Sequence, residues 1–207
     1  MFEAFKKGNE CWREQRVAFT ESDLYSSLPK SLLELFREFG ACSVRKGIYR
    51  ILDFSSSVHW AIIVETYFPP YKGKIIPFAF DWMGRQFCLH RDKPNIIFMF
   101  DPATHEDLWF KQSLVDFHNI DLVDDSESVL ADGLFESVLK HLQIEKLPYN
   151  ECIGYKIPLF LNGKDQIDNL ERISMEVYWE FQCQLFDQIK NLPEGTKIST
   201  VKFNERK

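Results

Sequence analysis

Residues 74–111 read KIIPFAFDWMGRQFCLHRDKPNIIFMFDPATHEDLWFK, and this stretch decides the fold. Short apolar runs alternate here with the turn sequences MGR, DKPN and DPAT. Gly, Pro, Asp and Asn residues between apolar runs mark the ends of β-strands. Connections this short join neighbouring antiparallel strands. The pattern therefore predicts a β-meander with strands at about 75–80, 86–90, 96–100 and 108–110.

Helical patterns lie on both sides of the predicted meander. Before it, Pro29 suits the first turn of a helix with one apolar face, and Gly40 suits its C-cap. Thr20 and Asp23 have the spacing of a capping box for an earlier helix. After the meander, helical patterns cover residues 114–123, 126–142 and 174–190. This order predicts an α+β fold with a single antiparallel sheet flanked by N-terminal and C-terminal helices.

Three other segments have weaker patterns. Residues 47–53 predict a short strand before the meander, and residues 155–161 predict a loop and a short strand after it. Residues 58–64 fit a strand, because several are β-branched, or a helix framed by serines and a Pro-Pro pair. The sequence leaves this last choice open.

The last predicted helix has an apolar face formed by Met175, Tyr178, Phe181, Leu185 and Ile189. This spacing predicts that the face packs against the sheet. On that basis, Phe181→Ala would leave a core cavity and cost roughly 3–5 kcal/mol of stability.

The composition is that of an ordinary globular protein. The chain has 207 residues, 45% of them hydrophobic and 27% charged, which excludes a disordered, collagen-like or disulfide-scaffold protein. It has no repeat and no Pro/Gly/Ser-rich linker, so residues 1–207 are expected to form one domain. Acids outnumber bases by 31 − 25 = 6, and the net charge of −6 argues against direct binding of a nucleic acid backbone.

The cysteines and the first residues indicate a reducing compartment. The five cysteines are odd in number and include no CxxC pair, so they are expected to be free thiols. The opening sequence MFEAFKKGNECWREQR is charged throughout and lacks the apolar core of a signal peptide. The apolar runs are too short to span a bilayer. We therefore expect a cytoplasmic protein with no membrane partner.

Signatures of the common enzyme classes are missing from the sequence. It contains no phosphate-binding glycine loop, no GxSxG, no HExxH and no kinase signature. Cys88 and His90 share one face of a predicted strand and could approach a metal together with His59 or His105. This set keeps a metal-dependent hydrolase using Cys88, His90 and His105 open as an alternative. A half-buried thiol and a solvated turn are the simpler interpretation, and no cofactor or metal is otherwise expected.

Negative charge is concentrated in one stretch of the chain. Residues 112–139 contain seven acids and neither Lys nor Arg, whereas the other 179 residues contain 24 acids and 25 bases. Such a surface can attract a basic partner, although two helices with solvated faces would give the same pattern. The acids are densest at the junction of two predicted helices. The candidate partner-binding residues are therefore Asp121, Asp124, Asp125 and Glu127.

Several N-terminal stretches together resemble a known group of immunity domains. LPKSLLELFREFG at 28–40, followed by GIYRILD at 47–53, is similar to the opening of GAD-like and SUKH-type immunity domains. FDWMGRQF at 80–87 and FDPATHE at 100–106 are similar to a hairpin and a turn of the same group, with His105 in place of a turn glycine.

The C-terminal part resembles a second group. GYKIPLFLNG at 154–163, with NLE at 169–171 and MEVYW at 175–179, closely resembles the C-terminal domain of type VI secretion DNase-immunity proteins. Asn162 replaces the first of two adjacent glycines in that pattern. The resemblance implies a GAD- or SUKH-like part at about 20–111 and an immunity-type part at about 112–200.

These resemblances imply a function without catalysis. They imply an antitoxin-like protein that binds and neutralises a secreted bacterial toxin. A basic nuclease domain would fit the acidic stretch, because nucleases present basic surfaces to nucleic acids. A regulatory interaction module of the same fold, without a toxin, stays open, and contacts could instead use the aromatic residues Trp82 or Trp109.

Overall fold

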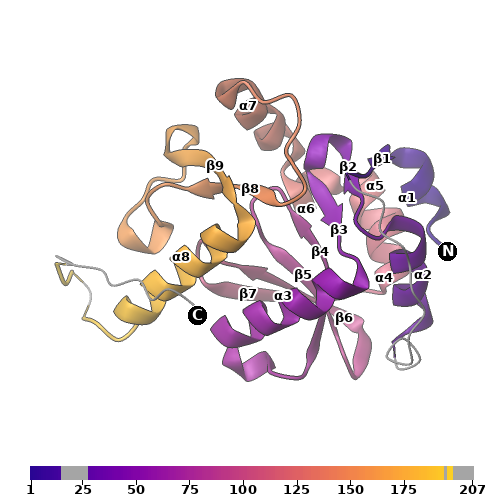
Figure 1. The fold of residues 1–207 in the computed structure, drawn as a ribbon, viewed down its shortest axis with the longest axis horizontal. Helices are drawn as coiled ribbons and strands as arrows, with labels where there is room; N and C mark the ends of the chain where they lie inside the picture. The colour runs from indigo at the N-terminus through magenta and orange to yellow at the C-terminus, as the bar shows by residue number, and fades with distance from the viewer. Residues whose placement is uncertain (15–27, 194, 198–207) are drawn as a thin grey trace.

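A computed structural model describes residues 1–14, 28–193 and 195–197. At the centre of these residues lies a seven-stranded sheet in which strand order follows chain order and all neighbouring pairs are antiparallel (Figure 1). The strands are β1 Cys11–Trp12, β2 Ser43–Val44, β3 Tyr49–Ile51, β4 Ile75–Asp81, β5 Gln86–His90, β6 Lys93–Asp101 and β7 Glu106–Lys111. The predicted meander is confirmed, and β1 to β3 extend it on one side.

Helices precede and follow the meander, which confirms the predicted α+β class. The α-helices are α1 Glu3–Gly8, α2 Lys30–Phe39, α3 Phe54–Tyr67, α4 Leu114–Asp116, α5 Leu122–Asp124, α6 Ser126–Leu130, α7 Asp132–Leu142 and α8 Met175–Ile189. A π-helical turn, η4 Phe117–Asp121, joins α4 to α5. The 3₁₀ turns are η2 Arg45–Gly47, η3 Pro69–Tyr71, η5 Leu159–Leu161 and η6 Ile167–Asn169.

A second, two-stranded sheet follows α7. It pairs β8 Glu151–Tyr155 with β9 Leu170–Ser174 in antiparallel register. The predicted strand at 155–161 is therefore wrong in its position: the strand ends at Tyr155, and residues 159–161 form a 3₁₀ turn. The predicted helix at 126–142 is also interrupted, because Ala131 adopts a left-handed conformation with φ 54° between α6 and α7.

Helix α3 resolves the ambiguous segment at 58–64. The Asp53 side chain accepts a hydrogen bond from the Ser56 N–H at 2.7 Å and so satisfies one free donor at the start of the helix. The β-branched residues of the segment do not prevent helix formation, because tertiary packing overrides their weak propensity. The other predicted cap, at Thr20 and Asp23, lies outside the described residues.

Helical elements cover both faces of the seven-stranded sheet (Figure 1). On one face, the ring of Phe117 in η4 lies 5.5 Å from that of Phe87 and 5.6 Å from that of Phe110. On the other face, the ring of Phe68, the residue that follows α3, lies 4.9 Å from the ring of Phe100. The core therefore forms two aromatic layers with the sheet between them.

Helix α8 packs on the same face of the sheet as α3. The Trp179 ring lies 5.9 Å from Trp60 and 6.2 Å from Phe68, and its indole N–H donates to the Gly84 carbonyl at 2.7 Å. The predicted apolar face of this helix is wrong at Phe181, which is only half-buried, whereas Trp179 and Cys183 are fully buried. The buried face is turned toward Trp179, which the predicted face omits.

Arg50 connects the sheet to the second hairpin. Its side chain is fully buried, donates hydrogen bonds to the Gly47 carbonyl and, at 2.6 Å, to the Glu151 carbonyl, and lies 4.5 Å over the Phe80 ring. Burial lowers the pKa of Arg50 to about 10. The guanidinium therefore holds β3 and β8 together across 101 positions of the chain.

Two positions where the resembled families have glycine show why glycine suits them. His105 has φ 58° and Asn162 has φ 63°, both in the left-handed region that glycine adopts without strain. Asn tolerates this region better than most residues. His105 is held by its ring, which stacks 4.6 Å from Phe68 and 3.8 Å from Phe186.

His118, which lies in the π-helical turn η4, is a fully buried polar residue. Its Nδ1–H donates to the Leu114 carbonyl at 2.8 Å, and its Nε2 accepts from the Tyr49 hydroxyl at 3.1 Å. The carbonyl can only accept, so Nδ1 carries a proton, and burial favours the neutral ring, in which Nε2 is the acceptor. Burial lowers the pKa of His118 to about 4.

We expect His118 to make stability depend on pH. Below about pH 6.5 the unfolded chain binds a proton there, whereas the folded chain does not until about pH 4. Stability that is present above pH 6.5 is therefore lost as the pH falls toward 4, by about 2 kcal/mol at pH 5. Urea unfolding at about pH 7.5 and pH 5 measures the loss. His118→Gln should show a smaller loss, and an equal loss in both proteins would contradict the assignment.

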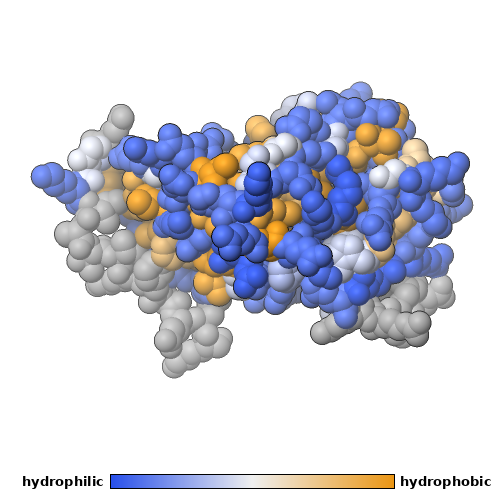
Figure 2. Space-filling model, turned by 90° about the horizontal axis from the view of Figure 1, so that it is seen from above, coloured by the Kyte–Doolittle hydropathy of each residue, from blue (hydrophilic) through white to orange (hydrophobic). Residues whose placement is uncertain are grey.

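The surface mixes polar and apolar residues. The face seen in Figure 2 is largely hydrophilic, and apolar residues show between the polar ones. Large apolar side chains that remain exposed include Ile62, Trp109, Ile157 and Val177. Within the described ranges, no helix has both the length and the apolar character that crossing a membrane requires.

Candidate functional site

The acidic stretch forms a series of helical turns from α4 to α7, with breaks at Asp125 and Ala131. The Ser113 hydroxyl caps its start by accepting the Asp116 N–H at 3.0 Å. Phe117 and Leu122 are buried against the core, and the acidic side chains face the other way. The apolar residues thus fix the turns to the sheet, and the acids are left on the surface.

The four candidate residues lie where the helical path breaks. Asp121 ends η4, Asp124 ends α5, and Asp125 precedes α6, of which Glu127 is the second residue. Asp124, Asp125 and Glu127 are exposed, whereas Asp121 is half-buried. The structure therefore places the four residues within a short segment around one break between helices.

The pKa of Asp121 is affected by its partial burial and by its acidic neighbours. Partial burial raises the pKa of Asp121, the Gln112 amide at 3.1 Å opposes that change, and the charges of Asp116 and Asp125 raise the pKa further. The π-turn spacing of five residues brings Asp116 toward Asp121 on the surface. These acids therefore form a concentrated negative surface, which we call the acidic patch: Asp116, Asp121, Asp124, Asp125 and Glu127.

Pairing with bases separates the acidic patch from the other two acids of the stretch. Asp132 accepts from Arg45 at 2.7 Å, and Glu136 forms an ion pair with Lys46 at 2.8 Å. Within the described part of the chain, no Lys or Arg pairs with any residue of the acidic patch. Among the described residues, the acids of this stretch that no base compensates are therefore those of the patch.

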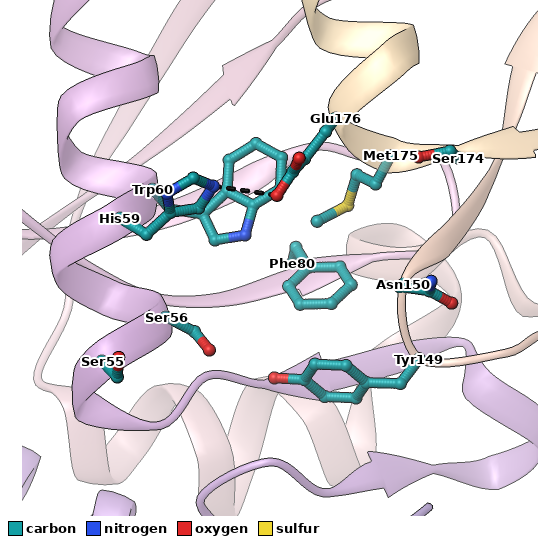
Figure 3. Close-up of a pocket in the computed structure, with 10 residues that line it drawn as sticks. All are labelled: Ser55, Ser56, His59, Trp60, Phe80, Tyr149, Asn150, Ser174, Met175 and Glu176. Carbon is teal, nitrogen blue, oxygen red and sulfur yellow. Dashed lines mark hydrogen bonds and ion pairs between the residues drawn. The ribbon is translucent and has the colours of Figure 1, made fainter.

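A groove lies between α3, α8 and the start of the β8–β9 hairpin (Figure 3). Its volume is about 580 Å³. Trp60, Phe80 and Met175 are buried residues that give it an apolar floor. The polar lining residues are Ser55, Ser56, His59, Asn150, Ser174 and Glu176, with Tyr149 at one end.

One hydrogen bond crosses the groove. His59 Nε2 lies 2.8 Å from Glu176 Oε1, and the pair joins α3 to α8 (Figure 3). Both side chains are more than half exposed, so solvent screens the pair and its contribution to stability is small. With an apolar floor and a polar rim, the groove can accept a side chain of a protein partner. No pattern in the sequence indicates this groove, because its lining comes from four separate segments.

The alternative set Cys88, His90 and His105 does not form one site. Cys88 is fully buried in the middle of the sheet, and burial raises the pKa of its thiol well above the usual value. His90 lies at the β5–β6 turn, opposite Lys93, whereas His105 lies at the β6–β7 turn at the far end of β6. Among the residues that the structure describes, no three His, Cys, Asp or Glu side chains gather as metal ligands.

The two aromatic candidates differ in exposure. Trp82 is fully buried, and its indole N–H donates to the Leu130 carbonyl at 2.6 Å. Trp109 is 63% exposed on β7. A protein partner can therefore reach Trp109 and cannot reach Trp82.

Comparisons with known proteins extend over most of the chain. Residues 113–186 match the family model described as T6SS immunity protein Tdi1, C-terminal. Residues 13–120 match the model of the SMI1 / KNR4 family, also called SUKH-1. A comparison with curated proteins finds no match.

A solved structure shares the fold. The crystal structure of Atu4351 from Agrobacterium tumefaciens is similar with a TM-score of 0.66 and 17% sequence identity, over 89% of each chain. At this identity the similarity shows the fold alone. The SMI1 / KNR4 match, by contrast, spans more than half of the 207 residues, and the protein therefore belongs to the SMI1 / KNR4 (SUKH-1) family.

Proposed function

We propose that the protein is a non-catalytic immunity protein that binds and neutralises a toxin in the cytoplasm. The observation that carries the proposal is the match of residues 113–186 to an immunity protein of type VI secretion. That match overlaps the end of the SUKH-1 match at residues 113–120 and includes the whole acidic patch. The chemistry of the site supports binding, because it offers charge and an apolar groove.

We further propose that the toxin is a nuclease that contacts the acidic patch, and in particular Asp121, Asp124, Asp125 and Glu127. A nuclease must present a basic surface to its substrate, and that surface is complementary to unpaired carboxylates. Covering this basic surface would also exclude the nucleic acid. The pairing of Asp132 and Glu136 within the chain supports a structural role for those two and leaves the patch for the partner.

The first experiment tests the role itself. The probe is the protein encoded by the neighbouring gene, produced in a catalytically inactive form and mixed with the full chain. We expect the two to co-purify, and we expect cells that express the active neighbour to survive only when this chain is co-expressed. Failure of both results would overturn the proposed function.

Neutralising the acidic patch should slow association with that probe. Changing Asp121, Asp124 and Asp125 to Asn and Glu127 to Gln should lower the association rate at low salt by on the order of tenfold. The salt dependence should become flatter, because fewer charges remain to be screened. Stopped-flow binding at low and high salt measures both effects.

A charge-matched variant is the control for net charge. Changing the exposed residues Glu10, Asp92, Glu145 and Glu171 to their amides removes the same four charges from other parts of the surface. This control should associate nearly as fast as the wild type. Equal slowing in both variants would show that net charge, and not the acidic patch, guides association.

A further inference from the structure

Strand β7 is an edge of the seven-stranded sheet that no strand among the described residues covers. It is the last strand in the sheet order, and two of its side chains are large and exposed: Leu108 at 55% and Trp109 at 63%. Exposed strand edges can pair with another chain, because their outward N–H and C=O groups lack partners. The opposite edge, β1, has only two residues.

Alternate residues of β7 direct their backbone N–H and C=O groups away from β6. The Gln112 N–H donates to the Asn95 carbonyl at 2.9 Å, so these two residues form a hydrogen-bonded pair at the end of the β6–β7 ladder. In an antiparallel ladder such pairs alternate with pairs that are not bonded to each other. The backbone groups of Asp107, Trp109 and Lys111 therefore point away from β6, and the described residues provide no strand to pair with them.

These three residues match a second copy of themselves. If two β7 strands pair about a two-fold axis at Trp109, the two Trp109 residues lie opposite each other and each Asp107 lies opposite a Lys111. All three are then hydrogen-bonded pairs, and opposite charges directly across an antiparallel pair stabilise it. The Asp107 carboxylate is already oriented on this face, because it accepts a hydrogen bond from the Tyr71 hydroxyl.

Other symmetric registers lack this match. A shift that centres the pair on Leu108 places Asp107 opposite Trp109 and leaves the charges unpaired. A shift that centres it on Asp107 places two carboxylates directly opposite each other, which is destabilising. The charges of β7 thus select one register.

We propose that two copies of this protein associate through β7 and form one continuous antiparallel sheet. The strand that pairs with this edge is β7 of a second copy. In the symmetric register, opposite charges face each other, and the residues that direct their backbone groups outward lie opposite one another. The pairing strand is only six residues long, so the contact is small and the association is weak.

Sedimentation velocity of the full chain from about 5 to 500 µM tests the proposal, since contacts of this size give micromolar affinities. We expect a concentration-dependent dimer, with a blue shift of Trp109 fluorescence as it forms. Lys111→Asp should abolish the dimer, because it places aspartates opposite each other at both ends of the pair. The double variant Asp107→Lys/Lys111→Asp should restore the dimer, because it exchanges the two charges.

Trp109→Pro is a second, independent probe. Proline removes the outward N–H without breaking the β6–β7 ladder, so the variant should fold and stay monomeric. A monomer at all concentrations, or a dimer that Lys111→Asp leaves intact, would overturn the proposal. If Trp109→Pro instead abolished binding of the toxin in a chain that never dimerises, the edge would belong to a toxin strand, and the proposal would also fail. The immunity role would stand in each case, because it is tested by toxin binding and cell survival.

Discussion

Replacing Arg50 with alanine is expected to lower the free energy of unfolding by about 3–5 kcal/mol, one of the two largest effects that we predict. The substitution leaves the carbonyls of Gly47 and Glu151 buried without their charged donor and removes the packing over Phe80. Recovery of the cost of burying the guanidinium offsets only part of this loss. Urea unfolding measures the change, and we propose that the wild-type chain unfolds as one unit in a single transition.

Two conservative variants separate the causes of that effect. Arg50→Met keeps most of the volume and removes the hydrogen bonds, and Arg50→Lys keeps the charge but not the planar fork that reaches two carbonyls. Both should be destabilised, by less than Arg50→Ala. A methionine variant as stable as the wild type would show that the contact with β8 contributes volume alone.

Trp179→Ala should lower stability by a similar amount, about 3–5 kcal/mol. The substitution leaves a large cavity between α8, α3 and the sheet and removes the hydrogen bond to the Gly84 carbonyl. Thermal and urea unfolding of the purified variant measure the loss.

Phe181→Ala is the matched control on the same helix. Phe181 is half-buried, so its truncation should cost clearly less than that of Trp179. The opposite order would mean that the helix is rotated relative to the sheet. We therefore expect a smaller loss of stability for Phe181→Ala than the roughly 3–5 kcal/mol that the apolar spacing alone predicts.

The meander could be predicted because its signals are local. Each turn, such as the one at Gly84 with φ 80°, is encoded by residues next to it. The β8–β9 hairpin could not be predicted in this way, because a long connection separates its strands. Asn169 stabilises that connection through hydrogen bonds to Ile157 and Lys164, which no short-range pattern reveals.

Helix α3 and the break at Ala131 could not be predicted from the sequence for two other reasons. Residues Trp60 and Val64 of α3 face the core while Val58 and Ile62 are exposed, so the helix is apolar around its circumference and has no clear period. Ala131 adopts a left-handed conformation that its sequence does not encode, since glycine or asparagine would be the usual choice.

The candidate acids could be counted from the sequence, but their pairing could not. Arg45 and Lys46 reach Asp132 and Glu136 across 87 and 90 positions, and only the fold brings them together. The groove at His59 and Glu176 depends in the same way on a contact across 117 positions. Surface charge is thus a property of the sequence, whereas the part of it left for a partner is a property of the fold.

The agreement between strand order and chain order has a consequence for synthesis on the ribosome. Each strand from β1 to β7 has its partner next in the chain, so the sheet can grow in the order in which its residues emerge, and closure of the short meander turns costs little entropy. The bond from Arg50 to the Glu151 carbonyl must wait until another 101 positions have been made. The sheet of the nascent chain can thus form before α8 and the second hairpin have been made, and during that interval the apolar surface that they cover is exposed.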